Sequence, residues 1–221
     1  MIKLIAFDWN GTLLDDTRIV AEATNITRRS FGYPPISFKR FRETYIIPVV
    51  DFWLATGGKK EDMATEHNIY HPAYEKLLAN RNIKLKKGAK ELLLWLQKNS
   101  IKTIIYSNHT EREIIYQLKR FKIRQYIGKV LARKGIEDQA HLHKRGKEAK
   151  LLDYIKSHKF KRTEIISIGD TCEEIDTGHN LKLHTVAISG GENTTKRIKE
   201  SRPDFLIGNL SQLIKIVEKL N

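Results

Sequence analysis

Short apolar runs punctuate most of this chain, separated by stretches long enough for helices. These runs are rich in β-branched residues and show little alternation between apolar and polar positions, as expected for strands covered on both faces of a parallel sheet. Four runs, and a weaker fifth after Pro203, are predicted as strands: residues 3–7, 103–106, 164–168, 184–188 and 204–207.

Between these runs, apolar residues recur at helical spacing. Leu92, Leu93 and Leu96 fall on one stripe of a predicted helix at 89–97. The same spacing occurs in three further segments, 113–121, 147–157 and 210–220. Alternating strands and helices predict an α/β fold, a Rossmann-like doubly wound core with a mostly parallel sheet.

One long stretch, residues 15–82, breaks this alternation because it contains helical patterns but no convincing strand run. It separates the first predicted strand from the second. We therefore expect an all-helical domain inserted into an α/β core made of residues 1–14 and 83–221. Four helices are predicted within the insert, at 17–31, 38–45, 49–56 and 61–79.

Composition adds an electrostatic feature to this outline. The 221 residues carry a formal net charge of +14, and residues 83–164 hold 22 Lys and Arg against 8 Asp and Glu. Solvated helix faces explain such a block, and a surface for a polyanion such as nucleic acid is the alternative.

The single cysteine, Cys172, cannot form an internal disulfide, which favours a reducing, cytoplasmic setting. No run is long enough for a membrane span or a signal peptide, and a monomer is expected.

Polar side chains gather where three predicted strands end. Ligands of open α/β sheets bind beyond the carboxyl ends of the strands, so these side chains are expected to converge. A carboxylate can attack phosphorus and form an aspartyl-phosphate, and Mg²⁺, which prefers oxygen ligands, would neutralise the approaching anions. The candidates are Asp8, Asn10 and Thr12 after the first strand, Ser107 and Asn108 after the second, and Asp170 and Glu174 after the third.

The run FDWNGTLLDD at 7–16 resembles the first motif of the haloacid dehalogenase superfamily of phosphohydrolases. YSN at 106–108 is similar to its second motif, and IGDTCEEID at 168–176 to its fourth. The helical insert resembles the C1-type cap of that family. The similarity extends over essentially the whole chain and is closest to the phosphoglycolate phosphatase-like branch. It implies a phosphatase that acts on a small phosphorylated metabolite.

The resemblance also implies a role for each matching residue. Asp8 would be the nucleophile, and Ser107, Asn108 and Thr12 would bind the phosphoryl group. Asp8, the Asn10 carbonyl and Asp170 would hold Mg²⁺, with Glu174 acting through a bound water. A lysine of the third motif would neutralise the nucleophile and the phosphate. Spacing to Asp170 favours Lys147 for this part over Lys144, and Lys150 is a weaker third choice.

Two positions depart from the family pattern. Asn10 stands where these phosphatases usually carry an acid–base Asp, and Glu174 stands where Asp is frequent. Asn cannot titrate, and general acid–base catalysis typically contributes about 10²–10⁴-fold to the rate. A catalytically impaired phosphate-binding protein is therefore the first alternative function. A phosphatase or binding protein for nucleic-acid ends, suggested by the basic block, is the second.

Three histidines are judged on their surroundings in the sequence. His109, beside the Ser107–Asn108 pair, is expected to be a solvated loop residue, with a substrate contact as the alternative. His141 and His143 lack the additional ligands that a zinc site requires, so no zinc is expected there.

Overall fold

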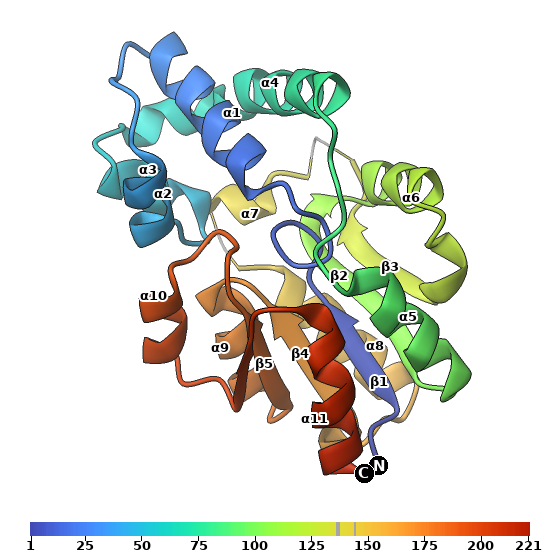
Figure 1. Cartoon of the computed structure of the whole chain (residues 1–221). Coiled ribbons are helices and arrows are strands. Elements are labelled where there is room, and N and C mark those ends of the chain that lie inside the picture. The colour runs from blue at the N-terminus through green and yellow to red at the C-terminus, as the bar shows by residue number, and fades with distance from the viewer. Residues whose placement is uncertain (136–137, 144) are drawn as a thin grey trace.

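The predicted α/β class is confirmed by the computed structural model, which describes residues 1–135, 138–143 and 145–221. Six parallel strands form one sheet in the order β3-β2-β1-β4-β5-β6 (Figure 1). The strands are β1 (Leu4–Phe7), β2 (Lys102–Thr110), β3 (Lys129–Arg133), β4 (Ile165–Gly169), β5 (His184–Ile188) and β6 (Phe205–Ile207).

The first strand occupies the centre of the sheet. All four residues of β1 are buried, and Leu4 lies opposite Lys102 of β2 on one side and opposite Ile165 of β4 on the other. The chain adds strands outward from β1 in both directions, so the loop after β1 lies where the strand order reverses. Such a switch point is the usual ligand site of open α/β sheets.

Two strands differ from the predictions. The edge strand β3, with the sequence KVLAR, was missed because Lys129 and Arg133 give its short apolar run a charged residue at each end. The second strand runs on to Thr110, whereas the prediction ended it at residue 106. Its pairing with β3 is irregular between Tyr106 and Thr110, so Ser107 and Asn108 lie in an irregular strand end and not in a loop.

Helices cover both faces of the sheet. One apolar cluster joins Ile5 and Phe7 to the helices α5 (Ala89–Lys98), α6 (Glu111–Arg120) and α11 (Leu213–Leu220). The opposite face packs against α8 (Lys147–Ser157), α9 (Cys172–Asn180) and α10 (Thr195–Glu200). Short elements complete the core: α7 (Ala140–His143) and the 3₁₀ turns η2 (Arg124–Tyr126), η3 (Arg162–Glu164) and η4 (Leu210–Gln212).

The regular elements between β1 and α5 are all helices. They lie over the carboxyl end of the sheet (Figure 1), and the predicted helix at 61–79 is divided by Thr65. Arg42 donates to the carbonyl oxygens of Gly191 and Asn193 at 2.7 and 2.8 Å, which ties this layer to the loop after β5. The elements are α1 (Thr17–Ser30), α2 (Phe38–Thr44), α3 (Val49–Ala55), η1 (Lys60–Ala64) and α4 (Glu66–Asn80).

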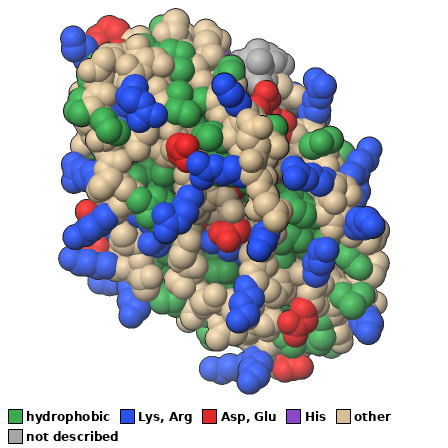
Figure 2. Space-filling view, turned by 45° about the horizontal axis from the view of Figure 1, so that its top comes forward, with side chains coloured by type: hydrophobic (Ala, Val, Ile, Leu, Met, Phe, Trp, Pro, Cys, Tyr) green, Lys and Arg blue, Asp and Glu red, His purple; other side chains and the backbone are tan. Residues whose placement is uncertain are grey.

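Lys and Arg side chains are scattered over most of the face drawn in Figure 2, with Asp and Glu among them. On this face the positive charge is not gathered into one stripe. Among the described residues, every helix is too short or too polar to cross a membrane.

Candidate active site at the carboxyl ends of the strands

Asp8 lies at the floor of a cavity between the sheet and the helical layer. It follows β1 directly, and its backbone N–H donates to the carbonyl oxygen of Ile168 in β4 at 2.9 Å, which fixes its position relative to that strand. The residue is 6% exposed, and Ser107 and Lys147 line the same cavity. Three segments far apart in sequence, the ends of β1 and β2 and the start of α8, therefore meet here.

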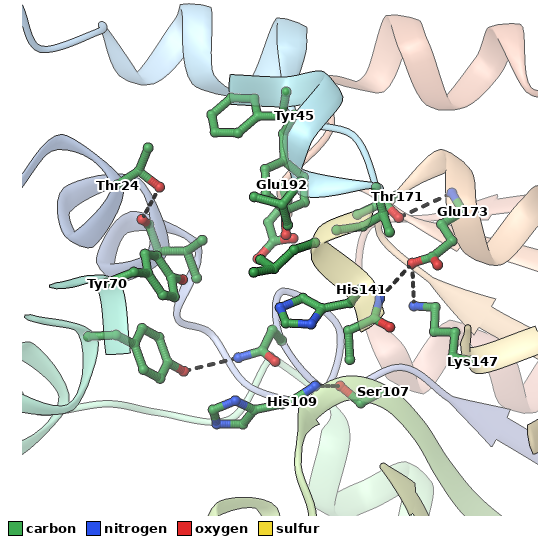
Figure 3. Close-up of a pocket in the computed structure, with 18 of the residues that line it drawn as sticks. Thr24, Tyr45, Tyr70, Ser107, His109, His141, Lys147, Thr171, Glu173 and Glu192 are labelled. Atoms are coloured by element: carbon green, nitrogen blue, oxygen red, sulfur yellow. Dashed lines mark hydrogen bonds and ion pairs between the residues drawn. The ribbon is translucent and has the colours of Figure 1, made fainter. Parts of the chain in front are cut away.

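Lys147 begins α8 and turns its buried side chain toward this carboxylate. Its Nζ lies 3.2 Å from Asp8 Oδ1 and 3.1 Å from Glu173 Oε2, and it also contacts Glu174 (Figure 3). Burial acts to lower the pKa of Lys147, but these three carboxylates outweigh it and hold the pKa well above its usual value. The ammonium is therefore charged at any physiological pH. Lys144, the alternative lysine, lies outside the described residues.

The Asp170 carboxylate is held in a tight backbone cradle after β4. Thr12 donates its hydroxyl to Oδ1 at 2.7 Å, and the Glu192 N–H donates to Oδ2 at 2.6 Å. A Cβ at Gly11 or at Gly191 would lie 2.3 or 2.0 Å from Asp170 Oδ2, so only glycine fits at either position. The backbones of the loop after β1 and of the loop after β5 therefore both lie close against this carboxylate.

Asn10 is held by a network that reaches into the helical layer. Its Nδ2 donates to Asp16 Oδ2 at 2.6 Å and to the Tyr74 hydroxyl at 3.0 Å, and Tyr74 also donates to Asp16 at 2.6 Å. Burial raises the pKa of Asp16, and these donors oppose that rise. The Asn10 amide therefore serves as a donor that stabilises a buried carboxylate.

The remaining predicted residues each have a defined hydrogen-bond partner. Asn108 Nδ2 donates to Glu173 Oε2 at 3.0 Å, and Ser107 Oγ accepts from the His109 N–H at 3.2 Å. Glu174 caps its own helix, because its Oε2 accepts from the Thr171 N–H and hydroxyl at 3.0 and 2.6 Å. Lys150 donates to the Ala132 carbonyl at 2.9 Å, away from Asp8.

The sequence did not indicate Glu66 and Glu192, two carboxylates that line this cavity. Glu192, in the loop after β5, is 5% exposed and lines the cavity near Tyr45 (Figure 3). Burial raises its pKa well above the usual value, and the charges of Asp170, Asp16 and Asp8 add to the rise. The only signal in the sequence was its place after a strand, behind the Gly190–Gly191 pair.

His109 was expected to be a solvated loop residue, and this expectation was wrong. The side chain is 8% exposed and packs edge-on against the Tyr74 ring at 5.5 Å. The irregular end of β2 carries it inward, below the helical layer. Burial lowers the pKa of His109 to about 3, and the positive charge of Arg133 contributes.

The carboxylates of this site fit a divalent cation. Burial raises the pKa of Asp8 well above its usual value against the effect of Lys147, and Glu174 and Asp170 add to the rise. Burial and Glu174 likewise raise the pKa of Asp170 to about 7. Within the described residues, no group of three or more His, Cys, Asp or Glu side chains is arranged to hold a metal. A divalent cation would therefore take Asp8 and Asp170 together with backbone and water oxygens.

Comparison with known proteins identifies the family of this chain. The family model described as haloacid dehalogenase-like hydrolase matches residues 5–188. The chain therefore belongs to the haloacid dehalogenase-like hydrolase family. The predicted enzyme class, a hydrolase of the phosphatase type, is confirmed at this level.

Relatives and solved structures match over nearly the full length. A phosphoglycolate phosphatase of Vibrio parahaemolyticus is 24% identical over 98% of this chain and 96% of its own. One of Photobacterium profundum is 25% identical, with 98% and 96% covered. A haloacid dehalogenase-like hydrolase of Streptococcus pneumoniae superposes with a TM-score of 0.81 at 20% identity and covers 98% of both chains.

Proposed function

We propose that this protein is a Mg²⁺-dependent phosphomonoesterase that acts on a small phosphorylated metabolite through an aspartyl-phosphate on Asp8. The observation that carries the proposal is the buried Asp8 carboxylate facing Lys147 at 3.2 Å in a cavity shared with Ser107. The names of the relatives above make 2-phosphoglycolate the first substrate to test.

The cation would be held by Asp8, Asp170 and the Asn10 carbonyl, with Glu174 acting through water. When bound, it would neutralise charge on the nucleophile and the phosphoryl oxygens. Lys147 supplies a second positive charge to the same groups. The Ser107 hydroxyl and the Asn108 amide would bind the phosphoryl oxygens, and Thr12, which donates to Asp170, would support the site from below.

In the first step an Asp8 oxygen would form a bond to phosphorus as the bond from phosphorus to the ester oxygen breaks. The leaving alkoxide takes up a proton. In the second step water attacks the phosphorus, inorganic phosphate leaves and the Asp8 carboxylate is restored. Asn10 can neither donate a proton to the leaving alkoxide nor accept one from the attacking water. We therefore expect slow turnover unless another group or the solvent performs these proton transfers.

Residues 15–82 would act as a cap over a core made of residues 1–14 and 83–221. The hydrogen bonds of Arg42 to the loop after β5, and of the Asn10 amide to the Tyr74 hydroxyl, support a closed arrangement. A closed cap excludes water from the reacting phosphoryl group. A cytoplasmic location and a monomeric state belong to the same proposal.

The test is release of inorganic phosphate from a panel of phosphorylated metabolites. We expect Mg²⁺-dependent activity that EDTA removes and added Mg²⁺ restores. Asp8→Asn should abolish it, whereas Asp153→Asn, an exposed position on α8, should not change it. Turnover that survives in Asp8→Asn would refute the assignment of the nucleophile.

Asn10 also keeps the first alternative open, a phosphate-binding protein with impaired catalysis. A silent wild type that Asn10→Asp activates would support that function. The second alternative, binding of nucleic-acid ends, predicts oligonucleotide affinity that falls steeply with salt. An affinity independent of salt would remove it.

A further inference from the structure

Four histidines form one wall of the cavity that contains Asp8. His67 and His71 come from α4, His109 from β2 and His141 from α7, and all four line the cavity. Figure 3 shows His109 and His141 near Ser107, with Tyr45 across the cavity from them. We call these four residues the histidine wall.

Each residue of the histidine wall has one buried ring nitrogen that no described group satisfies. These atoms are Nδ1 of His67, His71 and His141, and Nε2 of His109. The last lies 3.3 Å from Glu113 Oε2 without hydrogen-bond geometry. Buried polar atoms without a partner are rare in folded proteins, and a cluster of four in one cavity indicates a ligand with several acceptors.

The partners of two rings define where their protons lie. Arg133 Nη2 lies 3.1 Å from His71 Nε2, and a guanidinium can only donate. His71 Nε2 is therefore the acceptor, and the neutral ring carries its proton on Nδ1. Gln139 Nε2, an amide donor, lies 2.6 Å from His67 Nε2 and has the same effect. Both histidines thus present an Nδ1–H donor without a partner.

The Nδ1–H donors of His67 and His71, with the Arg133 guanidinium beside them, favour an anion over a cation. Burial and then Arg133 lower the pKa of His71 to about 4 and those of His109 and His141 to about 3, so these three rings are neutral at pH 7 and lie near the positive charge of Arg133. Carboxyl groups of α4 and α6 face the wall as well. Glu66 has its pKa raised to about 7 by burial, and Glu75 and Glu113 share a hydrogen bond. The described residues include no metal-binding group of His, Cys, Asp and Glu here either.

Arg133 links the wall to the proposed phosphoryl site. Its guanidinium donates to the Asn108 and Asp138 carbonyl oxygens as well as to His71. Asn108 neighbours Ser107, so a ligand on the wall and a phosphoryl group at Asp8 would occupy the two ends of one cavity.

We propose that the histidine wall binds a second anionic group of the substrate, a carboxylate or a phosphate. The inference rests on the proposed function and names its substrate class: small phosphate esters whose leaving group carries a further negative charge. The wall's N–H donors and the charge of Arg133 recognise that group.

The experiment compares substrates that differ only in the second charge. 2-Phosphoglycolate and 2-hydroxyethyl phosphate share a carbon skeleton, which ends in a carboxylate in the first and in an uncharged hydroxymethyl group in the second. 1,3-Propanediol bisphosphate and 3-hydroxypropyl phosphate make the same comparison for a phosphate. We expect wild type to prefer the charged member of at least one pair by about 10-fold or more in kcat/KM, and the pair that responds identifies the anion.

The variants separate recognition from folding. His71→Leu should raise KM for the charged substrate by about 10-fold and leave both constants for the neutral one within about 2-fold. His71→Asn, which keeps a donor near the Nδ1 position, should recover part of the preference. His141→Leu tests the wall from a second element, and His158→Gln, an exposed change on the far end of α8, is the control.

Equal kcat/KM for both members of both pairs in wild type would overturn the inference and leave the proposed function intact. An equal loss for charged and neutral substrates in both His71→Leu and His141→Leu would overturn it too. Absence of any Asp8-dependent phosphate release would overturn the proposed function, and the inference with it.

Discussion

The Lys147 ammonium lies 3.2 Å from the Asp8 carboxylate although 139 residues separate them in the sequence. This single cation also contacts Glu173 and Glu174, so it compensates a cluster of buried negative charge. Lys147 therefore both stabilises the fold and neutralises the proposed nucleophile, and a substitution there should affect both.

Lys147→Met should destabilise the protein and abolish phosphate release. Removal of one partner from a buried ion pair typically costs about 3–5 kcal/mol, because the other charges stay buried without compensation. The loss should shrink at lower pH, where the carboxylates become protonated. Urea denaturation at pH 5 and pH 7 measures it, with Lys150→Met as the control. An unfolding free energy equal to that of wild type at both pH values would show that Asp8 and its neighbours do not depend on Lys147.

Gly191→Ala should weaken the site with little effect elsewhere. The new Cβ would lie 2.0 Å from Asp170 Oδ2, so the carboxylate must move from its cradle. We expect the Mg²⁺ concentration for half-maximal activity to rise several-fold. Gly208→Ala is the matched control, because its Cβ would meet only Ser189 Oγ at 3.7 Å. An unchanged Mg²⁺ dependence in Gly191→Ala would argue against Asp170 as a ligand.

Asn10→Asp should raise turnover and lower stability. A carboxyl at position 10 restores a group that can exchange protons, for which about 10²–10⁴-fold is typical. It also replaces the amide donor, 2.6 Å from Asp16 Oδ2, with a second carboxyl. Like charges raise one another's pKa, so this pair would be stable while it holds a proton and would lose stability as pH rises. Denaturation from pH 5 to pH 8 should show a steeper decline than wild type; parallel curves would contradict the contact.

Glu66→Gln should stabilise the protein at alkaline pH. Burial raises the pKa of Glu66 from 4.5 to about 7, so the folded state holds a proton that the unfolded state releases between these values. Wild type therefore loses stability as pH rises from about 4.5 to 7, and the neutral amide avoids this loss. We expect a gain of roughly 1–3 kcal/mol at pH 8 and almost none at pH 4.5. Glu61→Gln, an exposed change in η1, is the control. A gain independent of pH would show that ionisation of Glu66 is not its cause.

Patterns along the chain predict the sheet core and the residues at three strand ends. Strands buried on both faces leave continuous apolar runs, so four strands and the positions of Asp8, Ser107 and Asp170 could be read directly. The spacing argument for Lys147 was also local, because the helix that carries it begins a fixed distance before β4. These features depend on neighbours along the chain.

Which distant side chains share the cavity depends on how the elements pack in three dimensions. Glu192, Tyr74 and Arg133 lie on elements that have no periodic signal for facing Asp8, and the edge strand β3 was too short and too charged to recognise. The histidine wall joins residues from α4, β2 and α7, and its open hydrogen-bond positions arise only when these elements pack together. Periodicity indicates which face of an element is buried. Contacts between elements depend on how the connections bring those faces together. The residues at the strand ends could therefore be predicted from the sequence, whereas the side chains that surround them in the cavity could not.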